Sequence, residues 1–421
     1  MTSKFDELTG LAAKQFFYEN VASTNQKDKN KHNYLIYLNI SDFKIFNDLF
    51  GRNKGDEILQ EIANLILPLA KSNKLCSRIN SDWFAFYLSE NDYSENILNN
   101  ITAHLNQKFK KETMPVTIHF GVYQFTENNP NISLAAGCAK RALKSIKGDS
   151  VKTIAYSDKA FMEKEERERN ITKVFDSALK NGEFKIFLQP QVSSQNELKG
   201  AEALVRWVNS NNEVIPPGEF IDTLEKTGLI SRLDNNIWEQ AAELLQKWQG
   251  TDKENLYLSI NISVKDFNYI DVYEICTDLT KRYNIPPQKL RLEITESVIM
   301  SNTKAILDII SRLRQYVFYI EVDDFGKGYS SLSLLKDLEV DMIKIDMDFL
   351  QKTNNIEKSA IILESIISMS KRLNIEVLTE GVETKAQQKF LTSVGCDMFQ
   401  GYYYDKPLSV SSFDSKYFKR R

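Results

Sequence analysis

The sequence lacks several features that mark whole classes of proteins. Its 421 residues include four cysteines, none of them in a C-x-x-C pair. A zinc ribbon or a disulfide scaffold is therefore excluded, and a reducing cytoplasm is the expected location. No uncharged apolar run approaches the roughly 18 residues that span a bilayer. Charged residues such as Lys4 and Asp6 stand where a secretory signal needs an apolar stretch, so we expect neither a membrane span nor a signal peptide.

An excess of charge of one sign is also missing. The chain has 54 Lys and Arg against 57 Asp and Glu, a formal net charge of -3. This balance argues against a protein that coats a nucleic-acid polymer. What is present, 42% hydrophobic and 26% charged residues, is the composition of a soluble globular protein, and the length predicts two or three domains.

A run of mixed charge divides the sequence at residues 158–170. Opposite charges three and four apart in good helix formers predict an exposed connecting helix. The expected organisation is therefore a first domain at 1–157, a connecting helix at 158–171 and a second domain at 172–421. The alternative is a surface helix within one large domain.

Both parts have an α/β pattern. In the first, expected strands at 34–40, 83–88 and 117–125 surround an amphipathic helix at 54–70, which predicts an α/β sandwich of roughly 150 residues. In the second, helix-length segments separate most of eight strand-like runs, which is the rhythm of a TIM-like (β/α)8 barrel. Those runs are residues 185–188, 201–207, 256–262, 290–294, 317–322, 342–345, 376–379 and 398–404.

Polar residues lie in or just after seven of these runs, where barrel enzymes place their chemistry. They are Glu202, Asn261, Glu293, Asp323 with Asp324, Lys344, Glu380 with Glu383, and Gln400. Convergent carboxylates repel one another unless a cation compensates, so the set predicts a metal site. Oxygen ligands without nearby Cys or His favour Mg²⁺ or Mn²⁺ over Ca²⁺.

The adjacent pair Asp323 and Asp324 can serve one site only where a strand ends, because successive strand residues point to opposite faces. One of the two could bridge a pair of ions about 3.5–4 Å apart. Lys344 would place a cation among the acids. For any single acid, an ordinary solvated loop residue is the better interpretation, whereas that interpretation is poor for the whole set in barrel register.

The second half resembles the EAL family of cyclic di-GMP phosphodiesterases across about Thr172 to Pro407. The signature E-A-L-x-R-W occupies residues 202–207. Supporting motifs in the same order are Gln189-Pro190, Pro217-x-x-Phe220-Ile221, Asn261, Leu292-Glu293-Ile294-Thr295-Glu296, Asp323-Asp324-Phe325-Gly326, Lys344-Ile345-Asp346, Glu380-Gly381-Val382-Glu383-Thr384 and Gln400-Gly401-Tyr402.

This resemblance implies a barrel whose first strand is antiparallel, and hydrolysis of cyclic di-GMP to linear pGpG by a cytoplasmic homodimer. It implies two metal ions bound by Glu202, Asn261, Glu293, Asp323, Asp324 and Glu380. The residues implied in catalysis are Glu202, Lys344, which would assist the attacking water, and Glu380.

Substrate contacts are implied for Gln189, Leu204, Arg206 and Gln400. Glu296 is expected to hold the loop after Asp324, and Glu383 to lie behind the ligands. Lys327 departs from the Thr or Ala that is usual in that loop, which bears on regulation rather than on the ligands.

The first half, about Phe5 to Asp158, resembles the GGDEF domain of diguanylate cyclases through motifs that include Phe43-Lys44-x-x-Asn47-Asp48 and Gly55-Asp56. Asn39 stands where that family has its first metal-binding aspartate, and Asn80-Ser81-Asp82-Trp83-Phe84 replaces the glycine hairpin. We therefore expect a degenerate domain without cyclase activity. Asn47 and Asp56 match guanine-reading positions, so the domain either binds GTP without turnover or serves as a scaffold.

The leading hypothesis is thus a metal-dependent cyclic di-GMP phosphodiesterase. A noncatalytic cyclic di-GMP receptor or protein-interaction module is the alternative from another class. A phosphodiesterase for another nucleotide is a third, weaker hypothesis.

Overall fold

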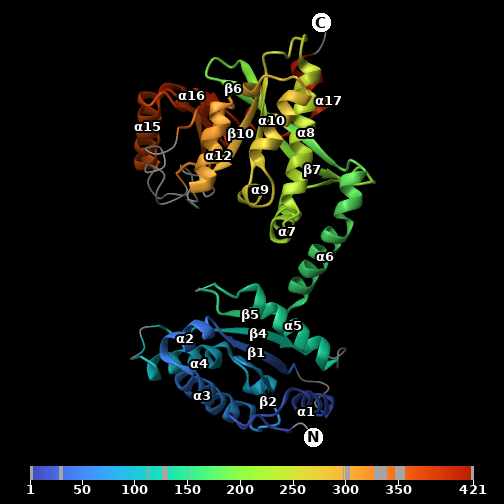
Figure 1. The fold of residues 1–421 in the computed structure, drawn as a ribbon, viewed down its shortest axis with the longest axis vertical. Helices are drawn as coiled ribbons and strands as arrows, with labels where there is room; N and C mark the ends of the chain where they lie inside the picture. The colour runs from blue at the N-terminus through green and yellow to red at the C-terminus, as the bar shows by residue number, and fades with distance from the viewer. Residues whose placement is uncertain are drawn as a thin grey trace. The chain divides into compact units, whose positions relative to one another are not determined.

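The structure, a computed structural model, describes residues 3–27, 32–110, 112, 114–125, 131–149, 151–296, 298, 304–326, 339–346 and 356–418. The chain forms two compact units, Met1–Arg167 and Glu168–Arg421 (Figure 1). Each unit has its own sheet and its own hydrophobic core.

The first unit is built on a five-stranded sheet with the order β2-β3-β1-β4-β5. Its strands are β1 (Tyr34–Ile40), β2 (Cys76–Asn80), β3 (Trp83–Leu88), β4 (Ile118–Gln124) and β5 (Ile154–Tyr156). The central strand β1 is antiparallel to both β3 and β4, and β5 joins β4 in parallel.

Helices cover both faces of this sheet because its central strand is apolar on both sides. They are α1 (Lys14–Lys27), α2 (Phe43–Phe50), α3 (Arg52–Ala70), α4 (Glu95–Lys108) and α5 (Ile132–Ser145). On β1, Ile36 and Leu38 join the cluster that includes α3 and α4, while Leu35 and Tyr37 join the cluster that includes α1 and α5. The predicted α/β sandwich is confirmed.

The second unit is a closed eight-stranded barrel. Its strands are β6 (Phe184–Ser193), β7 (Leu198–Val208), β9 (Tyr257–Ile262), β10 (Leu290–Thr295), β11 (Ile320–Asp323), β12 (Met342–Asp346), β13 (Glu376–Glu380) and β14 (Met398–Phe399). From β7 onward neighbouring strands are parallel, whereas β6 closes the ring antiparallel to both β7 and β14. The predicted barrel is confirmed, including its antiparallel first strand. Two short strands, β8 (Val214–Ile215) and β15 (Leu408–Ser409), pair with β7 and β6.

Side chains alternate between the outside and the inside of the barrel. On β9, Leu258, Ile260 and Ile262 belong to the main core, whereas Ser259 and Asn261 alternate with them. The surrounding helices are α7 (Ile221–Thr227), α8 (Ile230–Trp248), α9 (Val264–Tyr269), α10 (Val272–Arg282), α12 (Lys304–Gln315), α15 (Ile356–Arg372), α16 (Lys385–Ser393) and α17 (Val410–Tyr417). A separate small apolar cluster comprises Tyr257, Met342, Leu378 and Met398.

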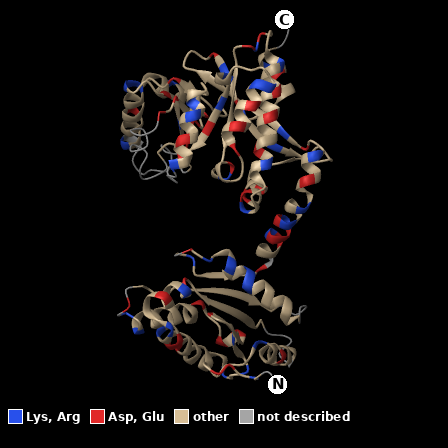
Figure 2. Cartoon of the chain, in the orientation of Figure 1, with Lys and Arg blue, Asp and Glu red and all other residues tan. Residues whose placement is uncertain are grey.

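Helix α6 (Lys159–Lys180) is longer than the charged run that predicts it, and charges of both signs follow one another along it (Figure 2). At its start, Asp158 accepts a hydrogen bond from the backbone N–H of Phe161 at 2.7 Å. Toward its end, Phe175 packs on Phe184, with 5.7 Å between the ring centroids. Phe184 is the first residue of β6 and pairs with Trp207 near the end of β7, so α6 joins the barrel at the carboxyl end of β7.

Two predicted strands are wrong at one end. The run 317–322 begins as a strand only at Ile320, because Val317 has a φ of 74°, which is incompatible with an extended chain. The run 398–404 ends at Phe399, because Gly401 and the residues after it form a turn.

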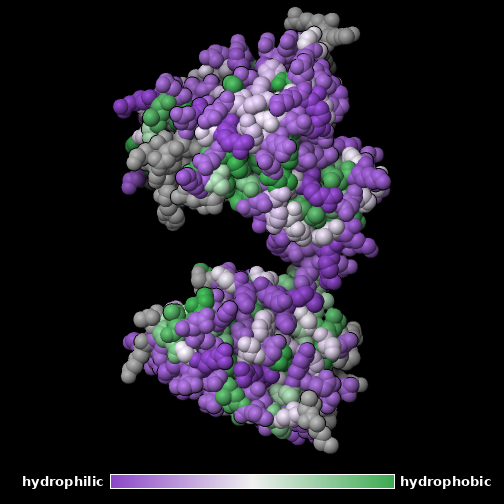
Figure 3. Space-filling view, viewed as in Figure 1, coloured by the Kyte–Doolittle hydropathy of each residue, from purple (hydrophilic) through white to green (hydrophobic). Residues whose placement is uncertain are grey.

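The face visible in Figure 3 is mostly hydrophilic, with apolar residues scattered among polar ones. All four cysteines are buried free thiols. Within the described ranges, no helix combines the length and the apolar character that crossing a membrane requires.

The packing of α5 on the sheet can be tested at Gly121 of β4. A Cβ added there would lie 2.0 Å from the carbonyl oxygen of Ala139, a backbone atom that cannot move aside. We expect Gly121→Val to lower the free energy of unfolding of the first unit by about 2–3 kcal/mol. Calorimetric unfolding measures the loss. Gly137→Ala on α5 is the control, since its Cβ would meet only the end of the Arg141 side chain; equal effects of the two variants would contradict the packing.

Candidate active site

The polar residues singled out in the sequence meet inside the barrel because the strand register brings them level. Asn261 pairs with Glu293 across β9 and β10, and Asp346 pairs with Glu380 across β12 and β13. Glu202 on β7 pairs with Ser259, two residues before Asn261 on the same face. Side chains from separate strands therefore converge on one interior space.

Lys344 on β12 lies at the centre of this space, with 1% of its surface exposed. Its Nζ is 2.6 Å from Oε1 of Glu293, 2.6 Å from Oε1 of Glu380 and 3.1 Å from Oε2 of Glu202. One ammonium group thus contacts three carboxylates from three strands. Breaking such a buried arrangement leaves uncompensated charge, which is strongly destabilising.

Amide side chains complete the surroundings of Glu202. Asn261 donates to its Oε1 at 3.0 Å, and Gln400 donates to its Oε2 at 2.5 Å. Gln400 in turn donates to Gln189 at 3.3 Å and accepts from Gln191 at 2.9 Å. Glu202 is therefore held from three directions.

The electrostatics of the cluster show more negative charge than Lys344 compensates. Burial raises the pKa of Glu293 well above its usual range, and the charge of Glu202 adds to the effect. Burial also raises the pKa of Glu380, to about 7. Burial alone would raise the pKa of Glu202, but Lys344 and the two amide donors outweigh it and lower the pKa. The same carboxylates raise the pKa of Lys344 well above that of a lysine in water, although burial acts to lower it.

These residues fit a divalent metal ion. Within the described part of the chain, Glu202, Glu293 and Glu380 each offer an oxygen, and the three oxygens lie within 4.8 Å of one another. Among the described residues, Oε2 of the buried Glu293 has no hydrogen-bond partner, so it can accept a further contact. An all-oxygen donor set with a surplus of negative charge suits a hard cation.

Asp323 and Asp324 stand where β11 ends, as the sequence predicts for adjacent acids that serve one site. Asp324 has a φ of 56°, and its N–H donates to Oδ1 of Asp323 at 2.7 Å. Burial raises the pKa of Asp323, and Glu202 and Asp324 act in the same direction. The chain thus turns away from β11 at Asp324 itself, in the left-handed conformation.

Glu296 accepts a hydrogen bond from the N–H of Gly326 at 3.2 Å, in the loop that the resemblance assigns to it. Lys327, the departure from the family pattern, lies outside the described residues.

A pocket of about 410 Å³ opens beside this cluster. The residues that line it are Gln189, Glu202, Leu204, Asp346, Glu380, Gly381, Glu383, Gln400, Gly401 and Tyr402. Leu204 and Glu383 are thus placed at the pocket. Arg206, half-buried, is not among the lining residues. Burial lowers the pKa of its guanidinium, which lies 5.9 Å from the ring centroid of Phe187.

The sequence reasoning gave no role to Gln191, Asp346 or Tyr402. Gln191 follows Gln189 by two residues on β6, and Asp346 follows Lys344 by two on β12. A period of two within a strand places both on the interior face, and this signal could have found them. Tyr402 lies beyond its strand and has no such signal.

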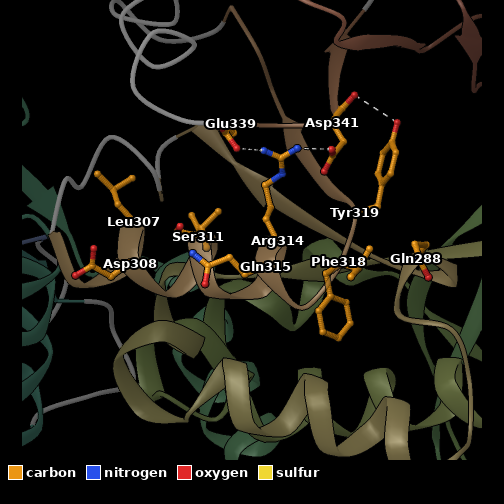
Figure 4. A pocket seen from close by; sticks show the side chains of 12 residues that line it. Gln288, Leu307, Asp308, Ser311, Arg314, Gln315, Phe318, Tyr319, Glu339 and Asp341 are labelled. Carbon is orange, nitrogen blue, oxygen red and sulfur yellow. Dashed lines mark hydrogen bonds and ion pairs between the residues drawn. The ribbon is translucent and has the colours of Figure 1, made fainter.

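A larger cavity of about 780 Å³ lies at the start of β11 and β12, whereas the acids gather toward the carboxyl ends of the strands. Figure 4 shows the guanidinium of Arg314 directed between Glu339 and Asp341, with contacts of 2.6 and 2.8 Å. In this cavity, the guanidinium of Arg314 thus already forms ion pairs with Glu339 and Asp341. We therefore place the chemistry at the smaller pocket, where the acids converge.

In the first unit, the amide of Asn39 donates to Oδ2 of Asp82 at 2.7 Å. Asn47 on α2 has a buried Oδ1 without a partner, and it lies against Gly55. Asp56 on α3 is exposed. Asp82, in the turn between β2 and β3, is thus hydrogen-bonded by a neutral amide.

Comparison with known proteins agrees with this geometry. Residues 173–407, more than half of the chain, match the EAL domain family. The chain belongs to the EAL family. Ahead of its EAL domain, residues 3–152 match the family described as diguanylate cyclase, GGDEF domain. Both resemblances are confirmed, in this order along the chain.

The two relatives described next match nearly the whole chain. Signaling protein YkoW of Bacillus subtilis (strain 168) is 30% identical over 97% of this chain and 52% of its own length. Cyclic di-GMP phosphodiesterase PdeR of Escherichia coli (strain K12) is 27% identical over 99% of this chain and 63% of its own. The chain therefore spans between half and two thirds of the length of these two relatives.

The EAL domain also resembles a solved structure described as PaMucR phosphodiesterase, c-di-GMP complex. The two are 31% identical with a TM-score of 0.55, over 58% of this chain and 99% of that one.

The central role of Lys344 can be tested through stability. Lys344→Met would leave three buried acids without their cation, and we expect the second unit to lose about 3–5 kcal/mol of unfolding free energy. Mn²⁺ should recover part of this loss, because an ion that binds only the folded state stabilises it. Thermal unfolding with Mn²⁺ and with EDTA measures both effects. Lys389→Met, at an exposed position of α16, is the control; a Lys344→Met protein as stable as this control in EDTA would contradict the assignment.

Proposed function

We propose that the EAL domain is a metal-dependent phosphodiesterase that hydrolyses cyclic di-GMP to linear pGpG. The observation that carries this proposal is the convergence of Glu202, Glu293 and Glu380 around Lys344 in a buried space beside a pocket. The similarity to PdeR, a cyclic di-GMP phosphodiesterase, and to the PaMucR phosphodiesterase in its c-di-GMP complex supports the substrate.

The residues proposed to bind Mg²⁺ or Mn²⁺ are Glu202, Asn261, Glu293, Asp323, Asp324 and Glu380. When bound, such ions would polarise the phosphate and make a bound water more acidic. Hydrolysis adds one water across one phosphodiester: a new P–O bond forms, the P–O bond to one ribose breaks, and the released ribose oxygen takes a proton.

The chain's own side chains position the reactants. Lys344 is a fixed cation that can hydrogen-bond a water or offset negative charge on the phosphate. Gln400 and Gln189, which hydrogen-bond to each other, hold the orientation of Glu202 and line the pocket. Arg206 has no carboxylate partner among the described residues, and its planar guanidinium suits a phosphate oxygen.

A noncatalytic cyclic di-GMP receptor is the competing function. Such a receptor has no need for buried acids whose mutual repulsion costs stability, and a site without catalytic demand could replace them with neutral residues. The retained cluster therefore favours the enzyme.

For the first unit we propose a GGDEF domain without cyclase activity, which binds GTP or acts as a scaffold. The Asn39 amide that donates to Asp82 supports this, because it takes the place of a second acid and leaves a single carboxylate for a metal.

The phosphodiesterase proposal is tested by incubating the protein with cyclic di-GMP and Mg²⁺ or Mn²⁺. We expect pGpG by chromatography, and none in EDTA. Glu202→Ala removes a ligand and an anchor of the amide network, so kcat should fall by about 10²–10³-fold or more. Glu197→Gln, at an exposed pair with Lys199, is the matched control. Binding of cyclic di-GMP without pGpG under either metal would support the receptor instead.

The proposal for the GGDEF domain predicts that GTP with Mg²⁺ yields no cyclic di-GMP. Glu202→Ala is the suitable background, because it prevents loss of any product that forms. Mass spectrometry of the reaction measures the outcome, and product above background would overturn the proposal.

Running the hydrolysis assay with and without GTP shows whether GTP binding regulates the EAL domain. If an effect of GTP on hydrolysis disappears in Asp56→Ala, the GTP site lies in the first unit.

A further inference from the structure

The side chain of Gln191 is buried beside the acids, yet it does not line their pocket. Gln191 lies on β6 and has 0% of its surface exposed. Phe399 of β14 pairs with Val192, so the next residue of β14's chain, Gln400, lies beside Gln191. The amide of Gln191 donates to Oε1 of Gln400 at 2.9 Å. Gln400 is among the lining residues of the pocket and Gln191 is not. Gln191 thus contacts the site through its neighbour.

The amide of Gln400 has two orientations of nearly the same shape, because half a turn about its last bond exchanges the oxygen and the NH2 group. An ionised carboxylate such as Glu202 only accepts hydrogen bonds. The NH2 group of Gln400 therefore faces it, with 2.5 Å to Oε2 of Glu202 and 3.3 Å to Oε1 of Gln189. This orientation leaves the oxygen of Gln400 to find its donor on the other side.

Gln191 supplies that donor. If Gln400 alone were reversed, two oxygens would face each other at Glu202 and two NH2 groups would face each other at Gln191. A buried polar group that faces its own kind loses a hydrogen bond that water would otherwise provide, which is unfavourable. The contact with Gln191 therefore adds to the cost of turning Gln400 the wrong way.

The far end of this chain of amides is fixed as well. Gln189 accepts from Gln400 and donates to the backbone carbonyl of Asp405 at 3.3 Å, an atom that cannot itself donate. The hydrogen bonds thus run in one direction, from Gln191 through Gln400 and Gln189 to Asp405. Without Gln191, the oxygen of Gln400 would be buried without this donor, and its amide would be held from one side only.

We propose that Gln191 is a positioning residue of the EAL domain. It fixes the amide of Gln400 with the NH2 group directed at Glu202, and so holds that carboxylate in the orientation in which it binds a metal ion. This inference rests on the proposed function, because it concerns Glu202 as a metal ligand. Residues that orient metal ligands typically contribute roughly 10- to 100-fold to metal affinity or activity.

The test replaces Gln191 by methionine, which has a similar length and volume but no N–H donor. We expect Gln191→Met to bind Mn²⁺ about 10- to 100-fold more weakly in a calorimetric titration. With cyclic di-GMP, kcat should fall by a similar factor while KM stays within about threefold, because Gln191 is not part of the pocket wall. Gln191→Asn, whose amide is one methylene too short to reach Gln400, gives the same test with a smaller change in the core.

A double variant shows whether Gln191 acts through Gln400. Gln400→Met removes the amide that Gln191 orients, so the protein with both substitutions should bind Mn²⁺ as weakly as Gln400→Met alone. Residues that act independently would instead multiply their losses. Multiplied losses in the double variant would overturn the proposal.

Gln240→Met is the matched control for a purely structural effect. Gln240 on α8 also bonds to β6, since its amide donates to the carbonyl of Phe184 at 2.9 Å and accepts from the N–H of Ile186 at 3.3 Å. Its loss should lower the temperature of thermal unfolding and leave the affinity for Mn²⁺ unchanged. If it weakens Mn²⁺ binding as much as Gln191→Met does, loosening of β6 explains both and the proposal is wrong.

The outcomes separate this inference from the proposed function. Hydrolysis by the unmodified protein, with unchanged kcat and Mn²⁺ affinity in Gln191→Met, overturns the role of Gln191 and leaves the proposed function standing. Binding of Mn²⁺ without hydrolysis by the unmodified protein contradicts the proposed function. The Mn²⁺ titrations then decide the role of Gln191: a loss that is absent in the Gln400→Met background supports it, and equal affinities overturn it. An unmodified protein that binds no Mn²⁺ contradicts both.

Discussion

The arrangement of the acids inside the EAL barrel depends on the ion pairs that the ammonium group of Lys344 forms with them. Three carboxylates from β7, β10 and β13 would repel one another in a low-dielectric interior, and one cation on β12 brings them to within hydrogen-bond distance. The compensation is incomplete, since burial and mutual repulsion still raise the pKa values of Glu293 and Glu380. The carboxylates are therefore held together by Lys344, and the surplus of negative charge is what the proposed metal ions would offset.

The two units differ in the groups that contact their acidic side chains. In the barrel, an excess of carboxylates is maintained around a lysine and amide donors. In the first unit, Asp82 accepts a hydrogen bond from the Asn39 amide, a neutral group that adds no charge. The two units therefore differ in the charge gathered at these positions, and the proposed division into one active and one inactive domain rests on this contrast.

Much of the fold could be read from the sequence because its signals are local. Strands β1 and β3 match their expected bounds, since both are short apolar runs with clear flanks. The acids could be found because barrel strands bring their carboxyl ends together. What could not be read depends on tertiary contacts: the left-handed conformation of Asp324, the positive φ of Val317, and the turn at Gly401 that packs on Val382. Tyr402 was missed for the same reason, as its place is set by that turn rather than by any strand period.

The reversed direction of β6 has a mechanical consequence. Had this strand run parallel to the others, the chain would enter the barrel at the floor, remote from the mouth. Instead α6 delivers the chain to the rim beside Trp207, and Glu168 and Asp176 on α6 pair with Lys226 of α7 and Arg232 of α8. The ion pairs of α6 thus fasten the incoming helix to the same end of the barrel at which the acids gather.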